Sequence, residues 1–524
     1  MALLSVVALG AIGCTNNDQG SGSVSASGTD GAASSPGSQP SGSSTRSSQP
    51  TSVESIVIEG DLSEVDWEAL VDKRVEIKGE LVVVDTFELL RRGQMKLARQ
   101  RLYVPTAIFD PNDKDASGTS TEGGNNVQPI RELQDDNDKG VVIVDDGLAD
   151  QNLFPPLLVP ELGKSIETIR VGSTVAGVSG RMVKAGRNLL LVVDGSLDLT
   201  LADRPERPEV GDADMTVASF NVLNYFTMID DGSNNARGAD SSAEFERQEA
   251  KLVSAISAMN ADVIGLMELQ NNLEAEQQLI DALNQDHGSE VYAGIGIPDD
   301  FLDSPGGGDS IRVGMIYRAD RVKPMGDLAM IDDKVFGLAR TPLVQAFEPT
   351  AGGKPVTVIV NHFKSKGGSS DAATDNKDRG DGQAAFNLAR KQQAAAICDY
   401  LESLDSDSSR VLVIGDLNAY QEEDPIDMLR SRGLIDLHEK VGSSASSDPA
   451  THSFVYYGQS GSLDHAFATA DLADDVTGVK VWHINSDEPR FVDYNTEYRP
   501  EELYKVNPYR SSDHDPVLIG IKCK

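Results

Sequence analysis

Residues 511–521 read Ser-Ser-Asp-His-Asp-Pro-Val-Leu-Ile-Gly-Ile, a polar cluster that passes directly into an apolar run. The run Val517–Ile521 predicts a buried strand. Asp513 and His514 would then lie at the mouth of that strand, where a loop presents a carboxylate and an imidazole together. Such a pair can hold a divalent cation and move a proton. A polar turn before a core strand is the simpler interpretation, so the choice depends on whether other strands end in similar side chains.

The composition indicates an acidic chain of several domains. The 524 residues carry 46 basic and 83 acidic side chains, a formal net charge of −37, and leave room for about two to four domains. This charge repels nucleic acid and anionic membranes, so an enzyme that acts on a polyanion would need a local basic patch, bound cations or high salt. The three cysteines, Cys14, Cys398 and Cys523, form neither a disulfide framework nor a zinc spacing. We expect Cys398 and Cys523 to be buried thiols, with a disulfide between them as the alternative.

The first 52 residues contain two segments outside the predicted domains. Residues 2–13 are apolar and small, too short for a transmembrane helix, and Cys14 follows them. This order resembles a bacterial lipoprotein signal, although no Lys or Arg precedes the apolar run. We therefore predict a signal at 1–14, lipidation of Cys14, and export to the cell surface or medium; a secretory peptide or a disordered start is the alternative. Residues 15–52, rich in Ser and Gly, predict a disordered tether.

Residues 53–203 predict a small β-barrel of OB-like type. Barrels of this kind often bind oligonucleotides, and the basic cluster between Arg91 and Arg101 would serve that purpose; a solvated helix face explains the cluster as well. Residues 204–213 contain two prolines and predict a linker, after which the large domain occupies 214–524. The barrel is predicted from short β-rich runs at 55–58, 75–84, 141–144, 169–182 and 189–193.

From Met215 onward, strands and helices alternate, which is the pattern of a layered α/β domain. Polar side chains recur where the strands end. Asn221 follows one apolar run and Glu268 closes the next, with a helix predicted between them over Gln248–Met259. An unpaired carboxylate on a buried strand is costly, and either a bound cation or a salt bridge would offset that cost.

A basic group follows the predicted strand Val356–Val360. His362, Lys364 and Lys366 come directly after it, and the three together suit a phosphate site. Arg340, which follows a loop, is a further candidate for a phosphate contact. This group would supply the local basic patch that the overall charge requires.

Two other predicted strands present carboxylates. Val411–Ile414 leads to Asp416 and Asn418, which are two residues apart and would project to the same side of an extended segment. A carboxylate and an amide on one side suit polarising a water or holding a phosphoryl oxygen. Asp464 enters the strand that follows it, and a buried aspartate can orient an imidazole and stabilise its cation.

These sites lie within eight motifs whose order resembles the endonuclease/exonuclease/phosphatase superfamily, which includes pancreatic-type deoxyribonuclease and abasic-site endonucleases. The closer resemblance is to the bacterial extracellular nucleases called ExeM and NucH, and it covers residues 215–522. The motifs are Phe220–Phe226, Arg237–Asp240, Gly265–Glu268, His362–Gly367, Gly415–Tyr420, Gly458–His465, Trp482–Asn485 and Ser512–Val517.

The resemblance implies a deoxyribonuclease-like α/β (α+β) sheet sandwich with helices outside, the site at one edge, and an OB-like domain upstream. It also implies a role for each matching residue. Glu268 and Asp513 match the carboxylates that bind the metal, with Asn221 beside them. His514 matches a catalytic histidine that Asp464 orients, and His362 matches a second catalytic histidine. Asp416 and Asn418 match the pair that handles the nucleophile and the phosphoryl oxygens, and Arg340 matches a phosphate-binding arginine.

The implied reaction is metal-dependent hydrolysis of nucleic acid, above all extracellular DNA, by in-line attack of water on phosphorus. Oxygen ligands favour a hard cation, Mg²⁺, Ca²⁺ or Mn²⁺, over zinc. Either His514 with Asp464, or Asp416, would take the proton from water, and the sequence leaves this choice open. Lys364 and Lys366 are candidates for phosphate contacts. We expect a monomer that meets a membrane only through a lipid on Cys14.

The sequence departs from the family pattern at two positions. Ala236 stands where many relatives have a cysteine, and Gln270 stands where relatives often have an acid. Two other functions remain open: a phosphomonoesterase or sphingomyelinase on the same fold, and a DNA-binding surface protein without activity, which would show gaps in the active-site set. We interpret the remaining histidines, His287, His438, His452, His465 and His483, as mainly structural.

Overall fold

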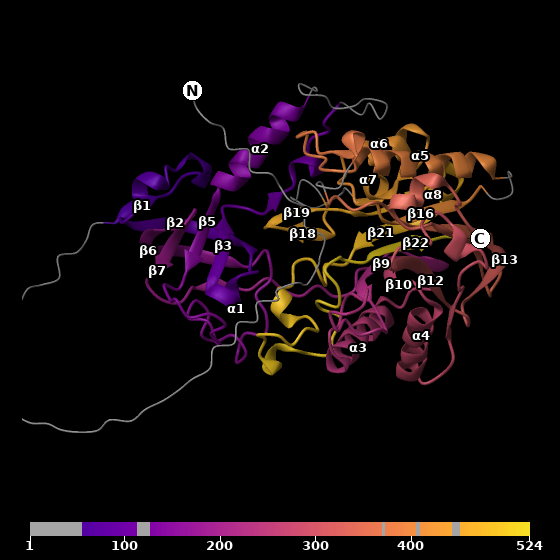
Figure 1. The fold of residues 1–524 in the computed structure, drawn as a ribbon, viewed down its shortest axis with the longest axis horizontal. Helices are drawn as coiled ribbons and strands as arrows, with labels where there is room; N and C mark the ends of the chain where they lie inside the picture. Colours follow the sequence, from indigo (N-terminus) through magenta and orange to yellow (C-terminus); the bar gives the residue numbers. More distant parts are fainter. Residues whose placement is uncertain (1–54, 113–125, 369–372, 405–408, 443–450) are drawn as a thin grey trace, which may run out of the picture.

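The computed structural model describes residues 55–112, 126–368, 373–404, 409–442 and 451–524. The signal, the lipidation site Cys14 and the tether, all predicted within residues 1–52, lie outside the described residues. Figure 1 shows two units side by side, a β-rich unit from the first part of the chain and a larger α/β unit. None of the helices that the structure describes has both the length and the hydropathy to span a bilayer.

The N-terminal unit contains a closed ring of five strands. Its sheet has the order β1-β2-β3-β5-β7-β6-β8, and an additional pairing of β2 with β6 closes the ring through β2, β3, β5, β7 and β6. The apolar side chains of these strands form one buried cluster. The elements are β1 (Ile56–Ile58), β2 (Arg74–Asp85), α1 (Leu89–Arg92), β3 (Gln94–Ala98), α2 (Val127–Lys139), β5 (Val141–Asp145), β6 (Thr174–Ala185), β7 (Asn188–Val193) and β8 (Leu199–Thr200).

The interpretation of the basic cluster as a solvated helix face holds only for Arg91 and Arg92, which are exposed on α1. Lys96 lies on β3, which the sequence analysis did not predict, and its ammonium pairs with Asp85 at 2.9 Å. Arg99 donates to the carbonyl oxygen of Lys78 at 2.7 Å, and Arg101 pairs with Asp487 at 2.7 Å. Three of the basic side chains therefore have partners within the protein.

The larger unit is built from two six-stranded sheets packed face to face. The first sheet has the order β11-β12-β10-β9-β22-β21 and the second β13-β14-β15-β16-β20-β17. The strands of the first are β9 (Met215–Tyr225), β10 (Val263–Gln270), β11 (Tyr292–Gly294), β12 (Ile311–Arg318), β21 (Val476–Val481) and β22 (Val517–Ile521). Those of the second are β13 (Val322–Met330), β14 (Leu343–Pro349), β15 (Val356–His362), β16 (Val411–Asp416), β17 (Ile435–Asp436) and β20 (Asp464–Ala468).

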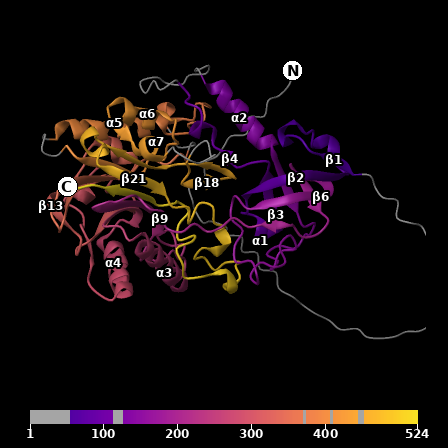
Figure 2. The ribbon, with the colours of Figure 1, turned by 180° about the vertical axis from the view of Figure 1, so that it is seen from behind.

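Helices cover the outer faces of both sheets, as Figures 1 and 2 show from opposite sides. On the first sheet, α3 begins six residues earlier than predicted because the Ser241 side chain accepts a hydrogen bond from the backbone of Glu244, an N-cap; its predicted end at Met259 is confirmed. The helices are α3 (Ser242–Met259) and α4 (Leu273–His287) on one face, and α5 (Asn387–Ser403), α6 (Asp424–Ser431), α7 (Leu437–Gly442) and α8 (Ala470–Ala473) in the second half of the unit.

The strands of this unit are apolar on both faces because both faces are buried. On β9, Val217 belongs to the cluster between the sheets, whereas Ala218 belongs to the cluster beneath α3 and α4. Successive side chains point to opposite faces of a strand, so one strand contributes to two cores. Gly265 on β10 lets the sheets approach closely, since a Cβ there would lie 2.7 Å from Val360. The predicted layered α/β domain is thus a sheet sandwich with helices outside.

The two units are joined by a small shared sheet and by buried contacts. Strand β4 (Leu102–Tyr103) of the N-terminal unit pairs with β19 (Gln459–Gly461), which pairs with β18 (Phe454–Tyr456). Phe491 and Leu503 from the larger unit pack into the core of the N-terminal unit. The N-terminal unit therefore supports the segment that contains β18 and β19.

Cys398 and Cys523 are both buried and free of disulfide bonds. The prediction of two buried thiols is confirmed.

His465 predicts how stability depends on pH. Its ring is buried, Nε2 lies 2.8 Å from the carbonyl oxygen of Ala419, and burial lowers its pKa to about 4. Because the unfolded imidazole titrates near its ordinary value, this side chain stabilises the fold fully above pH 6.5, and that stability is lost as the pH falls toward 4. Between pH 7.5 and 4.5 we expect the free energy of unfolding of wild type to fall by about 2.5 kcal/mol more than that of His465→Gln. Urea unfolding at both pH values measures this difference. Equal losses would contradict the assignment; exposed His287→Gln is the control.

Candidate active site

Polar side chains from both sheets meet at one edge of the sandwich. Asn221 lies on β9 and Glu268 on β10, where Asn221 pairs in register with the residue before Glu268. In the second sheet, His362 at the end of β15 pairs with Asp416 at the end of β16, and Asp416 pairs with Asp464 at the start of β20. The register of neighbouring strands therefore brings together five residues that are far apart in the sequence.

Glu268 occupies a bulge in β10. The pairing of β10 shifts register on both sides at this residue, and its backbone has a φ of +67°, in the left-handed region that few non-glycine residues adopt. Its carboxylate accepts hydrogen bonds from the Asn221 amide at 3.1 Å and from the backbone of Asn224 at 3.0 Å. Burial, together with the negative charge of Asp513, raises the pKa of Glu268. The bulge thus directs the Glu268 carboxylate, which would be costly to bury in the core, toward the edge of the sandwich.

Asp416 is the centre of the cluster. Its Oδ2 lies 3.4 Å from the Asn221 amide nitrogen, 3.5 Å from Nε2 of His362 and 3.9 Å from Nε2 of His514. Burial raises the pKa of Asp416 to about 7, against the opposing effect of the positive charge on His514. Such a carboxyl can accept and release a proton near neutral pH. Burial lowers the pKa of His362 well below its usual value, and the charge of Arg340 adds to this effect.

The segment after Asp416 is a turn, which corrects the expected extended geometry. The backbone of Asn418 has a φ of +49° and donates to Asp416 Oδ1 at 2.8 Å, and the Asn418 amide donates to the carbonyl oxygen of Phe363 at 3.2 Å. Gly415 is required beside it, because a Cβ there would lie 2.0 Å from the carbonyl oxygen of Asn361. Asn418 therefore lies at the cluster through a turn between strand ends rather than through strand alternation.

His514 is held by a buried aspartate. Its Nδ1 lies 2.8 Å from Oδ2 of Asp464, and the same oxygen accepts a hydrogen bond from Ser453 at 2.6 Å. The ring of Phe454 lies 4.7 Å from the imidazole. Although burial alone would lower the pKa of His514, the charges of Asp464 and Asp416 raise it well above its usual value. These charges favour the imidazolium form of His514, whose Nε2 faces Asp416.

The other predicted residues lie near the cluster or away from it. Asp513 is half-buried and its charge acts on both Glu268 and His514. Arg340 is buried, 3.5 Å from Asp309, and its charge acts on Glu268 and His362. The structure thus brings both residues into the electrostatic field of the cluster.

Lys364 and Lys366 differ in whether a carboxylate pairs with their ammonium group. The ammonium of Lys364 lies over the ring of Phe386 and 3.2 Å from the Ser365 hydroxyl, with no carboxylate within 4.0 Å among the described residues. Burial and the charge of Arg340 lower its pKa. Lys366 is instead tied to the buried carboxylate of Glu423, with one oxygen 2.6 Å away. As a correction to the sequence analysis, the charge of Lys366 is already neutralised, and we do not retain it as a phosphate contact.

Sequence reasoning missed three residues of the site. Arg237 is exposed, and its charge acts on both His362 and Lys364; its motif was noted without a role. Ser453 and Phe454 support Asp464 and His514 from the segment next to β19. Neither lies in a noted motif, so only the strand pairing could reveal them. Gln270 has a structural role, since its side-chain oxygen Oε1 accepts hydrogen bonds from the backbone N–H groups of residues 227 and 228.

The donor atoms of the cluster fit a divalent cation. Glu268, His362 and Asp416 each offer one ligand atom, all within 4.8 Å of one another. Both carboxylates have raised pKa values because of burial, and a cation would relieve the cost of ionising them together. A donor set dominated by oxygen suits a hard cation.

A second group, His452, His483 and Asp515, lies equally close together but is a satisfied hydrogen-bond network. The two imidazoles stack in parallel with centroids 4.1 Å apart, so their lone pairs do not converge on one point. Asp515 already accepts hydrogen bonds from the backbone of Asn485 and Ser486 and lies 3.0 Å from His483. These histidines are structural, as interpreted from the sequence.

Residues 218–514, more than half of the chain, match the profile of the family described as Endonuclease/Exonuclease/phosphatase family. No curated protein matches the chain. Similar solved structures include a family member from Bacteroides thetaiotaomicron at 17% identity, with a TM-score of 0.39 and coverage of 58% of this chain and 96% of that one.

Two further solved structures illustrate the range of similar proteins. The mannosyl-6-phosphatase of Bacteroides thetaiotaomicron is 15% identical, with a TM-score of 0.39 and coverage of 59% and 99% of the two chains. TDP2 of D. rerio, complexed with a single-strand DNA product, is 14% identical, with a TM-score of 0.36 and coverage of 58% and 97%.

Proposed function

Because the chain belongs to the endonuclease/exonuclease/phosphatase family, we propose that it is a metal-dependent phosphodiesterase that hydrolyses nucleic acid, with DNA as the preferred substrate. The observation that carries this proposal is the meeting of a cation-binding cluster, Glu268, His362 and Asp416, with an imidazolium held by Asp464. Proton transfer and charge stabilisation at one point are what in-line attack of water on a phosphodiester requires.

Glu268 and Asp416 would hold the cation, with Asp513 and Asn221 beside them, and Mg²⁺ or Ca²⁺, with Mn²⁺ as a substitute, would suit these oxygen donors. The bound cation supplies charge stabilisation for the phosphoryl oxygens. The protein residues do the remaining work. The charges of Asp464 and Asp416 favour the protonated form of His514, which would donate to a phosphoryl oxygen, while the Asp416 carboxylate, which also faces the cation, would accept the proton of the attacking water. We therefore propose Asp416 for the proton-accepting role that the sequence left open.

A local set of cations explains how an acidic chain would hold a polyanion. Arg237, Arg340 and Lys364 all act electrostatically on the cluster, and Arg237 makes no ion pair with any residue in the described ranges. A protein with net charge −37 repels nucleic acid as a whole. We therefore expect these three side chains to contact phosphates of the substrate.

The full chain incubated with supercoiled plasmid tests the proposal. With Mg²⁺ and Ca²⁺ we expect nicked and then linear DNA, and with a chelator we expect intact plasmid. Bis-p-nitrophenyl phosphate and p-nitrophenyl phosphate, assayed in parallel, separate a phosphodiesterase from a phosphomonoesterase. Hydrolysis of the monoester alone, with plasmid and RNA intact under all metals and salts, would overturn the proposal.

Lys364 and Lys366 provide a contrast between binding and stability. We expect Lys364→Met to raise KM for DNA about tenfold at low salt and to reduce the salt dependence of binding by about one phosphate contact, with normal folding. Lys366→Met leaves Glu423 as a buried charge without its cation and should lower the free energy of unfolding by about 3–5 kcal/mol. Steady-state kinetics and urea unfolding of both variants measure this. A Lys366→Met protein of normal stability with raised KM would reverse the two assignments.

We also propose that the N-terminal unit is an OB-like domain, that the chain is a monomer of the ExeM and NucH type, and that it is exported and anchored through a lipid on Cys14. The closed five-strand ring supports the first proposal, and the sequence order around Cys14 supports the last. Fractionation of cells that express wild type or Cys14→Ser tests the anchor. Unchanged membrane association of the variant would contradict it.

A further inference from the structure

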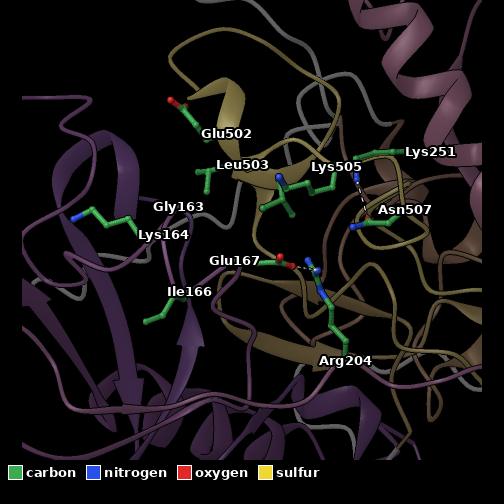
Figure 3. A pocket seen from close by; sticks show the side chains of 11 residues that line it. Gly163, Lys164, Ile166, Glu167, Arg204, Lys251, Glu502, Leu503, Lys505 and Asn507 are labelled. Atoms are coloured by element: carbon green, nitrogen blue, oxygen red, sulfur yellow. Dashed lines mark hydrogen bonds and ion pairs between the residues drawn. The ribbon is translucent and has the colours of Figure 1, made fainter.

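A cavity of about 70 Å³ lies between the two units, away from the active-site residues described above. It is lined by the segment Gly163–Glu167 of the N-terminal unit, by Arg204, by Lys251 of α3, and by the segment 502–507. Figure 3 shows Lys251, Lys505 and Arg204 around the same space, with Glu167 beside Arg204. At about 10–15 Å³ for each water-sized probe, the cavity holds roughly five water-sized groups, which is the number of heavy atoms in a tetrahedral oxyanion.

Lys251 is the unusual residue of this cavity. Its side chain is 1% exposed, and its ammonium donates to the carbonyl oxygen of Tyr509 at 2.8 Å and to the Asn507 side chain at 3.4 Å. No carboxylate lies within 4.0 Å of it in the part of the chain that the structure describes. Besides these two oxygen acceptors, the ammonium lies 5.5 Å from the centroid of the Tyr504 ring, a weaker contact that an anion can displace from its third donor. Burial, reinforced by the charge of Arg204, lowers the pKa of Lys251 to about 7.

The charges that line the cavity are mainly positive. Lys164, Arg204, Lys251 and Lys505 stand against Glu167 and Glu502. Arg204 is held by Glu488, at 2.8 Å and 3.0 Å, and the exposed Lys505 makes no ion pair with a described residue. Arg204 also lies 3.7 Å from Glu167, so among the described residues the lining cations without a carboxylate partner are Lys164, Lys251 and Lys505, an arrangement that suits an anion in a chain of net charge −37.

We propose that this cavity binds a tetrahedral oxyanion, with the Lys251 ammonium as its buried contact and Lys505 at its mouth. The oxyanion is either a free phosphate or sulfate ion or a phosphate group of a nucleic-acid strand, and the second source rests on the proposed function. The bound anion has a further consequence: Lys251 holds the carbonyl of Tyr509, and the chain continues from there to Asp513 and His514. An anion bound to Lys251 would therefore stabilise the segment from Tyr509 to His514, which carries two active-site residues.

Thermal unfolding of the full chain in sulfate tests the site. Sulfate has a fixed charge near neutral pH and is titrated against NaCl at constant ionic strength. We expect the Tm of wild type to rise and saturate, as a bound ligand requires, above the unsaturated general effect of sulfate on proteins. Lys251→Met keeps the aliphatic stem, removes the buried charge, and should lack the saturating rise; Lys480→Met, an exposed lysine on β21, should keep it.

A second variant, Lys505→Gln, tests the site even if Lys251→Met does not fold. Lys505 is exposed, so Lys505→Gln should fold normally and move the midpoint of the sulfate titration several-fold higher. A selenate-soaked crystal gives a direct view, with a selenium peak expected within hydrogen-bond distance of the Lys251 ammonium. Identical Tm curves for wild type, Lys251→Met and Lys505→Gln, or a cavity without selenium in a crystal that binds selenate elsewhere, would overturn the proposal.

Anisotropy with a dye-labelled phosphorothioate oligonucleotide, in chelator to prevent cleavage, separates the two sources. If Lys251→Met and Lys505→Gln weaken both sulfate and oligonucleotide binding, the site takes a phosphate of the strand. If they weaken sulfate binding alone, it takes a free oxyanion. If they weaken neither, the proposal is wrong. The sulfate result does not require any hydrolysis, so failure of the proposed function and failure of this site are distinguishable.

Discussion

Replacing His514 with alanine is expected to lower kcat for plasmid cleavage by about 10³-fold, within the usual range for a group that donates or accepts a proton in the transition state. The reason is that His514 is the one imidazole of the cluster whose pKa is raised, by the charges of Asp464 and Asp416 against the effect of burial. It therefore supplies a positive donor where negative charge develops. KM should change little, because Arg237, Arg340 and Lys364 remain to hold the substrate.

Two further variants make this prediction specific. Asp464→Asn keeps the shape of the side chain but removes the charge that holds His514 protonated, so we expect a smaller loss, about 10²-fold. His287→Ala removes an exposed imidazole at the end of α4 and should leave kcat unchanged. Circular dichroism and urea unfolding establish that each variant is folded. A folded His514→Ala enzyme with more than a tenth of the wild-type kcat would remove His514 from the reaction.

Replacing Glu268 with glutamine is expected to lower activity by about 10²-fold at a fixed low Mg²⁺ concentration, equivalent to about 2.7 kcal/mol of transition-state stabilisation. Glutamine keeps the shape of the side chain and can still accept from Asn224, but it loses the charge that attracts the cation. The activity of this variant should recover in part as the Mg²⁺ concentration rises. Chelation should abolish activity in wild type, and added Mg²⁺ should restore it.

The same variant has an opposite effect on stability. Burial and the charge of Asp513 raise the pKa of Glu268, so the folded state disfavours the ionised form of this side chain. In chelator, Glu268→Gln should therefore be at least as stable as wild type, and it should lose most of the rise in Tm that Mg²⁺ produces in wild type. Glu246→Gln, which neutralises an exposed glutamate on α3, is the control. A Glu268→Gln protein that is less stable in chelator but keeps its metal response would show that Glu268 is structural rather than a ligand.

The apolar runs of the larger unit predicted its strands well because a strand buried on both faces must be apolar at every position. The run Val517–Ile521 is β22 with those bounds, and 411–414 lies within β16. Strands without a continuous apolar run were harder to predict. Strand β13, whose residues are mostly exposed, has no apolar run, and β3 interrupts a basic cluster that resembles a helix face.

Most of the cluster could be predicted because each residue stands at one end of an apolar run: Asn221, Glu268, His362 and Asp416 close or follow a run, and Asp464 precedes one. The sequence could not separate Lys364 from Lys366, since both follow the same strand at similar distance. Their difference depends on Glu423, which is 57 residues from Lys366 in the sequence and reaches it only in the folded chain.

The sequence alone determined the layered α/β class and the strand ends that carry the polar residues of the site, because continuous apolar runs and the cost of a buried carboxylate are both local properties of the chain. Only the tertiary structure decided which charges are compensated. It placed Asp464 and Asp416 beside His514 and Glu423 beside Lys366, and among the described residues it placed no carboxylate within 4.0 Å of Lys251. Protonation states and free donors depend on distances and burial between segments that lie far apart in the sequence, and those exist only once the two sheets and the N-terminal unit have packed together.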